Sequence, residues 1–308
     1  MAINSLAFRD NFTSELDKKL VQTSQAAILG SGMKHLFVGA HTVKMPSISF
    51  VGLGDYNRDT GFSKGAVSVT HQTFTLSKDR GRTFSIDRED MDETGIAGLA
   101  GQVMGEFVRT QVAPEVDAYA FSNIAAKATA ASQTVALGTG ETIAKNALKL
   151  VRSAISKADE ATGFNGEELV VFVNPEVYNA LMSTAEINRY IRMDEFKKGE
   201  LTTKVAKIDN AIILPVADAR MKSAYTFDTG STTSKGGFTA TSSASNIGLI
   251  CMPKKAAELV KKTEKIRVFN PDVNQDMDAY KFDYRLYYDV LIKDSLKGAI
   301  YTYTYSAS

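Results

Sequence analysis

The chain has 308 residues, a length typical of about two domains. Its 36 lysines and arginines balance 35 acidic residues, so the net charge of +1 gives no electrostatic footprint for general nucleic-acid binding, although a protein that only encloses nucleic acid fits this balance. The single cysteine, Cys251, excludes a disulfide framework within the chain, and its apolar neighbours predict a buried thiol rather than a nucleophile.

The first 34 residues carry an amphipathic pattern. Its apolar positions suit one face of an α-helix: Phe8, Phe12, Leu16, Leu20, Ile28 and Leu29. No adjoining strand pattern is evident to cover this stripe. We therefore predict an N-terminal arm over residues 1–34, which either packs on a partner or folds back. We favour the partner, with Phe8, Phe12 and Leu16 as candidate inter-subunit contacts.

Residues 35–84 have a β texture. Two alternating segments, 43–50 and 67–76, flank a polar, turn-rich stretch, and a phase slip before Phe74 predicts a bulge. This pattern predicts a long, extended β-hairpin with a charged tip. Because an isolated two-stranded ribbon is marginal in water, we expect contact with another element or another subunit. The candidate contacts at the tip are Tyr56, Arg58, Asp59 and Lys64.

Residues 85–128 show a helical apolar pattern that predicts a long spine helix, within a segment that we place at 85–134. A helix of some 40 residues would be ~60 Å long. Five carboxylates near its start suit the positive end of the helix dipole. Pro114 should kink or restart the helix. The glycines from Gly95 to Gly105 indicate either close packing of another backbone or a frayed first half.

The next block, residues 135–246, reads as a compact α/β domain after a small-residue linker at 129–140. It contains two predicted helices and two predicted buried strands, at 141–161, 169–173, 174–182 and 211–216 in chain order. A run of Gly, Ser, Thr and Ala over residues 229–245 predicts a flexible loop.

Residues 247–308 have a strand pattern and are expected to return to the region of the spine helix, mostly as part of its domain. The segment 258–269 is heavily charged, as an edge strand should be. Period-two alternation over 280–292 predicts a second strand. We expect residues 300–305 to pair with it after a Lys-Gly turn. We expect these antiparallel strands to pack on the spine helix.

Two motifs invite an enzymatic or metal-binding interpretation. Ser63 lies in a G-x-S-x-G pattern, but a nucleophile elbow needs a strand before it and a helix after it, and here a polar turn precedes and a strand follows. A serine hydrolase that uses Ser63 is therefore only a remote alternative. Asp272, Asn274 and Asp276 resemble the start of a calcium loop, but Met277 and Asp283 replace the required Gly and Glu. We favour a solvated turn there and expect neither catalysis, metal nor cofactor.

Targeting signals are also lacking. The N-terminal residues have no signal-peptide regions, and no uncharged apolar run approaches the ~18 residues of a membrane span. We expect a soluble protein, made in the cytosol, without membrane contact.

The order of these features, with several short motifs, carries a family resemblance. The motifs lie at residues 83–87, 114–119 (Pro-Glu-Val-Asp-Ala-Tyr), 174–178 (Asn-Pro-Glu-Val-Tyr) with Leu181, 207–216, 249–256, 267–271, 285–293 and 297–301. Together, and over nearly the whole chain, the sequence resembles the major capsid proteins of tailed bacteriophages with the HK97-like fold, an α+β fold.

The resemblance implies a shell subunit without catalytic activity. In that family the hairpin lies over a neighbouring subunit, the spine and terminal strands form a peripheral domain, and the α/β block forms an axial domain. The resemblance further implies pentamers and hexamers in an icosahedral head around double-stranded DNA, a separate scaffolding protein, a portal, and a place in the virion after assembly in the host cytoplasm. A cross-link from Lys64 to Asn270 or Asn274 is not expected. An encapsulin-like nanocompartment shell is the alternative.

Overall fold

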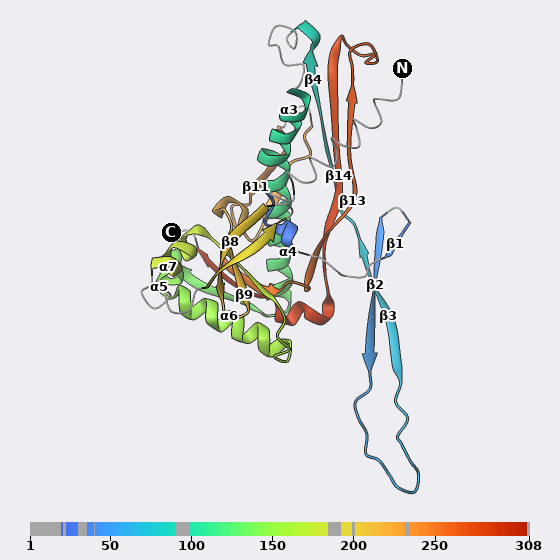
Figure 1. Cartoon of the computed structure of the whole chain (residues 1–308), viewed down its shortest axis with the longest axis vertical. Coiled ribbons are helices and arrows are strands. Elements are labelled where there is room, and N and C mark those ends of the chain that lie inside the picture. The colour runs from blue at the N-terminus through green and yellow to red at the C-terminus, as the bar shows by residue number, and fades with distance from the viewer. Residues whose placement is uncertain are drawn as a thin grey trace. The chain divides into compact units, whose positions relative to one another are not determined.

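The computed structural model describes residues 20, 23–29, 36–39, 41–89, 99–183, 192–198, 201–231 and 235–306, with the backbone alone at 99–102, 139–142, 192–198 and 201–205. These residues divide into two compact units (Figure 1). Residues 32–77 form the smaller unit, and residues 1–31 and 78–308 form the larger one. The predicted arm contacts Phe8, Phe12 and Leu16 and the acidic stretch 90–98 lie outside the described residues.

The smaller unit is the predicted hairpin. Strands β2 (Thr42–Phe50) and β3 (Val67–Thr75) pair antiparallel, and the short strand β1 (Leu36–Val38) pairs with the base of β2. The expected bulge before Phe74 is wrong, because the register runs without a shift from Thr42 opposite Thr75 to Phe50 opposite Val67. The last seven residues assigned to the hairpin, 78–84, belong to a strand of the larger unit instead.

That strand, β4 (Lys78–Asp87), belongs to a three-stranded antiparallel sheet of long strands (Figure 1). The sheet has the order β13 (Ala257–Phe269), β14 (Ala279–Ile292), β4. The charged β13 lies at one edge, which confirms the edge-strand prediction. Ser85–Asp87, where we expected the spine helix to begin, continue β4 and pair with β14. Apolar residues at Phe84 and Ile86 fit the start of a helix as well as a strand. The hydrogen bonds with β14 make this segment a strand.

The spine consists of α3 (Leu99–Phe107), a π-helical turn at Val108–Val112 (η2) and α4 (Ala113–Ala130). The π turn stands directly before Pro114, and the amide of Ala113 donates to the carbonyl of Val108, five residues back. A π turn can absorb the missing N–H and the ring clash of a proline within a helix. Helix residues such as Phe121 and Ile124 are fully buried and join one core with Phe282 and Leu286 of β14, as expected.

The second sheet has seven strands in the order β5-β15-β12-β6-β9-β8-β7. Their bounds are β5 (Thr134–Thr139), β15 (Tyr301–Ser306), β12 (Asn246–Pro253), β6 (Leu169–Val173), β9 (Ala211–Pro215), β8 (Leu201–Ile208) and β7 (Arg192–Lys198). The predicted linker at 129–140 is thus largely the end of α4 and an edge strand. β15 pairs with β12 and β5 rather than with β14, so the expected pairing of residues 300–305 across the Lys-Gly turn is wrong. Residues 247–306 therefore supply strands to both sheets.

Helices cover both faces of this sheet, which explains why β6 is apolar throughout. Val170 and Phe172 face the core with the spine, whereas Val171 and Val173 face a second core. That second core contains helices α5 (Gly140–Lys145), α6 (Ala147–Ala161) and α7 (Pro175–Ser183). A strand buried on both sides reads as a continuous apolar run.

The remaining elements are short. They are the 3-10 turns η1 (Ala26–Ile28), η4 (Asp218–Arg220) and η5 (Asp294–Ala299), and the ribbon β10 (Tyr225–Phe227) with β11 (Phe238–Ala240). The ribbon lies partly within the stretch that we expected to be a flexible loop.

Gly81 of β4 offers a test of how closely the sheet is packed. A Cβ at this position would lie 2.8 Å from the carbonyl oxygen of Tyr284. Gly81→Ala should therefore lower the free energy of unfolding, measured by urea denaturation, by about 1–3 kcal/mol, because backbone must move. At Gly138 of β5 a Cβ would meet nothing within 4 Å. An equal loss in Gly138→Ala would contradict the steric explanation.

Candidate assembly surfaces

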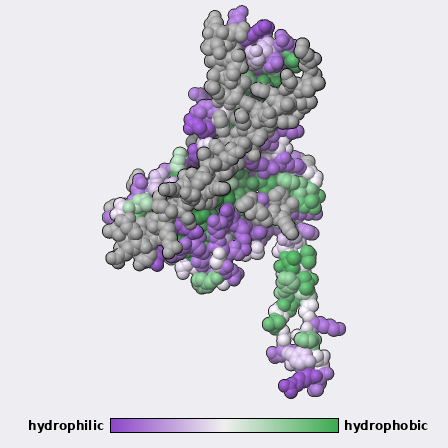
Figure 2. All heavy atoms as spheres, viewed as in Figure 1, coloured by the Kyte–Doolittle hydropathy of each residue, from purple (hydrophilic) through white to green (hydrophobic). Residues whose placement is uncertain are grey.

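The outer half of the hairpin has two chemically different faces. Directly paired residues of antiparallel strands share a face, so the pairs Phe50–Val67 and Ile48–Val69 share one. These four side chains are 57–73% exposed. The opposite face carries only hydroxyl side chains: Ser47, Ser49, Ser68 and Thr70. Figure 2 shows apolar side chains gathered along the hairpin of β2 and β3 and hydrophilic ones at its tip. A large exposed apolar patch marks a contact surface.

The tip is a structured turn. The amide of Gly61, at a φ of +80°, donates to the carbonyl of Asn57 (2.8 Å), and the Asn57 side-chain oxygen accepts from the amide of Asp59 (2.8 Å). The rings of Tyr56 and Phe62 pack with centroids 4.9 Å apart, and Phe62 is 87% exposed. A rigid, exposed aromatic pair is the type of group that anchors protein interfaces.

The predicted contact candidates at the tip are all exposed. Tyr56, Arg58 and Asp59 come together in the turn, and Lys64 follows it. Whether they contact another subunit stays a prediction. Sequence reasoning missed the apolar face, with Ile48 and Phe50 as its largest members. The signal was present, because apolar and hydroxyl residues alternate in both strands at matching positions.

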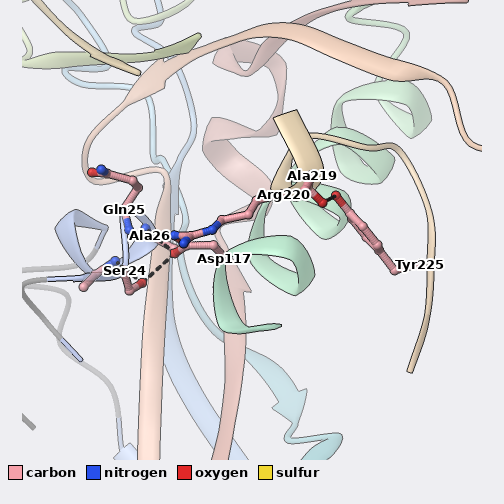
Figure 3. Close-up of polar contacts among 8 residues, drawn as sticks. Ser24, Gln25, Ala26, Asp117, Ala219, Arg220 and Tyr225 are labelled. Carbon is pink, nitrogen blue, oxygen red and sulfur yellow. Dashed lines mark hydrogen bonds and ion pairs between the residues drawn. The ribbon is translucent and has the colours of Figure 1, made fainter. Parts of the chain in front are cut away.

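A buried carboxylate anchors the end of the predicted arm (Figure 3). Asp117 of α4 is fully buried. It accepts hydrogen bonds from the Ser24 hydroxyl (2.6 Å) and from the amides of Gln25 (3.0 Å) and Ala26 (2.9 Å), and it pairs with Arg220 (2.9 Å). The carboxylate thus takes the free amides at the start of the η1 turn, in the manner of a helix cap. Leu20, Ile28 and Leu29 lie buried in the core with the spine, so this end of the predicted arm folds back on its own chain, and the favoured packing on a partner is wrong for these three residues.

The turn that carries Arg220 is itself held in place. The Tyr225 hydroxyl donates to the carbonyl of Ala219 (2.8 Å) and accepts from the amide of Lys222 (2.9 Å). Burial raises the pKa of Tyr225 well above its ordinary value, so the hydroxyl keeps its proton at neutral pH.

A second polar node ties β4 to the spine and to the loop between β10 and β11. Arg80 donates to both oxygens of Glu115 (2.6 and 3.1 Å) and to the carbonyl of Asp228 (2.7 Å). The hydrogen bond with Glu115 raises the pKa of Arg80. The Lys78 ammonium lies 4.2 Å from the centre of the Phe227 ring, and burial lowers its pKa. These cations link three elements that are far apart in sequence.

The two chemical motifs do not form a recognisable site. Ser63 is exposed between the tip turn and β3, and no helix follows it. Asn274 donates to the carbonyl of Ala279 (2.9 Å), Asp276 pairs with Lys281 (3.2 Å), and Asp272 lies 3.9 Å from Arg88. Among the described residues, no three His, Cys, Asp or Glu side chains are grouped as metal ligands, and no helix has the length and apolar character to cross a membrane.

Solved structures define the class of fold. A chain from Gordonia phage Cozz has a TM-score of 0.58 at 14% identity, covering 93% of this chain and 88% of that one. The mature capsid of bacteriophage PhiM1 has a TM-score of 0.56 at 12% identity, covering 86% and 82%. A virus-like particle from Pyrococcus furiosus has a TM-score of 0.53 at 10% identity, covering 96% and 99%. The fold is therefore the α+β HK97-like capsid fold.

The family follows from the sequence itself. Residues 71–301, most of the chain, match the sequence model described as "Phage capsid protein". The chain belongs to this family of phage capsid proteins and is a major capsid protein of the HK97-like type, a structural component of a virion that assembles with copies of itself. No curated protein matches the chain in sequence.

Proposed function

We propose that this protein assembles as pentamers and hexamers into an icosahedral phage head around double-stranded DNA, without catalytic activity. A separate scaffolding protein and a portal would take part, and assembly would occur in the host cytoplasm. The observation that carries the proposal is the hairpin. Its outer half exposes four large apolar side chains on one face of a ribbon that is marginal by itself. In a self-assembling shell, a neighbouring subunit would cover this apolar face of the hairpin.

Deletion of residues 54–62 tests this proposal. The deletion removes the tip and leaves both strands of the hairpin and the larger unit intact. We expect the variant to lose assembly, seen by sedimentation and electron microscopy, while its circular dichroism keeps the helix and strand signal of the α/β part. Closed shells from the deletion variant, or a spectrum of an unfolded chain, would contradict an intermolecular role for the hairpin.

The likeness to the virus-like particle from Pyrococcus furiosus favours one second candidate, a nanocompartment shell with protein cargo. The contents of purified particles decide between the two. A phage head holds nuclease-protected double-stranded DNA after packaging, whereas a nanocompartment holds a co-purifying protein in fixed stoichiometry. We expect DNA.

A further inference from the structure

A groove of about 880 Å³ runs beside β4 in the larger unit. Six consecutive β4 residues, 79–84, line it. Because successive side chains of a strand point to opposite faces, an unbroken run of lining residues means that the groove follows the backbone edge of the strand. β4 pairs with β14 on its other side, and no described strand pairs with the edge at the groove. An open strand edge presents unpaired amides and carbonyls that can accept another strand.

The other walls of the groove combine apolar side chains with glycine-rich turns. The spine contributes Phe107 and Val112, β14 contributes Tyr284, and the glycine-rich turns at 229–230 and 236–237 close the groove opposite β4. Gly230 and Gly236 leave room for the Arg82 guanidinium, whose Nη1 atom lies 3.1 and 3.4 Å from where their Cβ atoms would stand. The strand edge suits an extended segment, and the walls that Phe107, Val112 and Tyr284 form suit an occasional apolar side chain on it.

The charges of the groove favour an acidic occupant. Arg80 is neutralised by Glu115, and Arg285 donates to both oxygens of Asp79 (2.8 and 2.5 Å). Arg82 and Lys235 also line the groove. Both are exposed, and within the described part of the chain neither has an ion-pair partner. Asp228 also lines the groove, so four cations face three carboxylates there, and one carboxylate on the occupant would complete this local charge balance.

The hairpin contains a segment with the matching properties. Residues 51–55 read Val-Gly-Leu-Gly-Asp. Beyond the bond from the Val51 amide to the Ala66 carbonyl (3.3 Å), residues 52–56 form no backbone–backbone hydrogen bond with any other described residue. In an extended conformation Val51, Leu53 and Asp55 share one side and two glycines occupy the other. The Leu53 side chain is fully exposed.

We infer that residues 51–55 of a second copy add as a strand to the open edge of β4. Asp55 would then lie near Arg82, and Leu53 would pack against Phe107 and Tyr284. The inference rests on the proposed shell function and names the surface that receives the hairpin. Tip and groove are different surfaces of the same chain, so each copy binds the next in a head-to-tail contact. Such contacts close into rings when the rotation between copies permits, as pentamers and hexamers require.

A charge swap tests the pairing in the full-length protein. Asp55→Arg and Arg82→Asp should each raise the protein concentration needed for assembly by about tenfold or more, because like charges would meet in the groove. The double variant should return to within roughly threefold of the wild type. Asp59→Arg serves as the matched control, since Asp59 is an exposed acid of the same tip. Combined with Arg82→Asp, it should not restore assembly.

Hydrogen exchange gives a second readout that needs no variant. Peptides covering residues 78–87 and 51–56 should exchange at least about tenfold more slowly in assembled particles than in dissociated subunits, because strand addition protects backbone amides. Equal exchange of the β4 peptide in both states would overturn the inference. So would slow exchange of every β4 amide in dissociated subunits, where only the amides that bond β14 should be protected, since it would assign the groove to a segment of the same chain.

The outcomes separate this inference from the proposed function. Shells that form equally well with Asp55→Arg, Arg82→Asp and the wild type would contradict the groove alone. A wild-type chain that stays monomeric at high concentration, even with its scaffold, would contradict both.

Discussion

The double variant Ile48→Asp, Phe50→Asp is expected to fold and to fail to assemble. Both side chains lie on the exposed apolar face of the hairpin, on β2 opposite Val69 and Val67. Losing two buried apolar side chains from a subunit contact costs about 3 kcal/mol or more, which corresponds to roughly a hundredfold rise in the concentration needed for assembly. Sedimentation velocity should show subunits where the wild type forms shells or rings.

The opposite face of the same strand supplies the control. Ser47→Asp, Ser49→Asp introduces the same two charges on the hydroxyl face of β2. This variant should assemble within a few-fold of the wild type, because polar side chains already occupy that face. If both pairs of substitutions were equally harmful, repulsion between the added charges would explain the loss, and the apolar face would have no special role.

Asp117→Ala should cause a large loss of stability in the larger unit. The substitution leaves the Ser24 hydroxyl, two backbone amides and the Arg220 guanidinium without their shared acceptor. Removing one partner of a buried ion pair costs about 3–5 kcal/mol, mostly because the remaining groups stay unpaired. Urea denaturation should record this loss, and hydrogen exchange should show residues 23–29 opening before the rest of the core.

An exposed ion pair on the spine is the comparison for Asp117. Glu106 and Arg109 are paired on the helix surface, each more than half exposed. Glu106→Ala should leave stability unchanged within error, since solvent replaces the interaction. A similar loss from both substitutions would mean that general weakening of the helix, rather than the anchor at residues 24–26, explains the Asp117 result.

Local periodicity predicted much of this fold correctly. Alternation in the segments 43–50 and 67–76 predicted the hairpin, the charge of segment 258–269 predicted an edge strand, and the three-to-five-residue apolar steps after Leu99 predicted the spine. These signals are short-range, and each follows from which side chains one element must bury. Reading them in order also led to the HK97-like resemblance that the family match confirms.

Errors arose where one local pattern fits two structures or where the partner is distant in sequence. The residues from Ser85 to Asp87 suit a helix start as well as a strand end, and pairing with β14, about 200 residues later, makes them a strand. Residues 134–139 read as a linker and form a strand because β15 lies beside them.

For the candidate surfaces, the sequence by itself determined which residues are apolar and how they alternate, because a strand places every second side chain on the same face. The tertiary structure alone decided what each group meets. It placed Asp117 beneath residues 24–26, although 91 residues separate Asp117 from Ala26, and it left one edge of β4 open beside a groove. The physical reason is that a buried polar group takes whichever donors the packing brings to it, and the spacing of residues along the chain does not encode that choice.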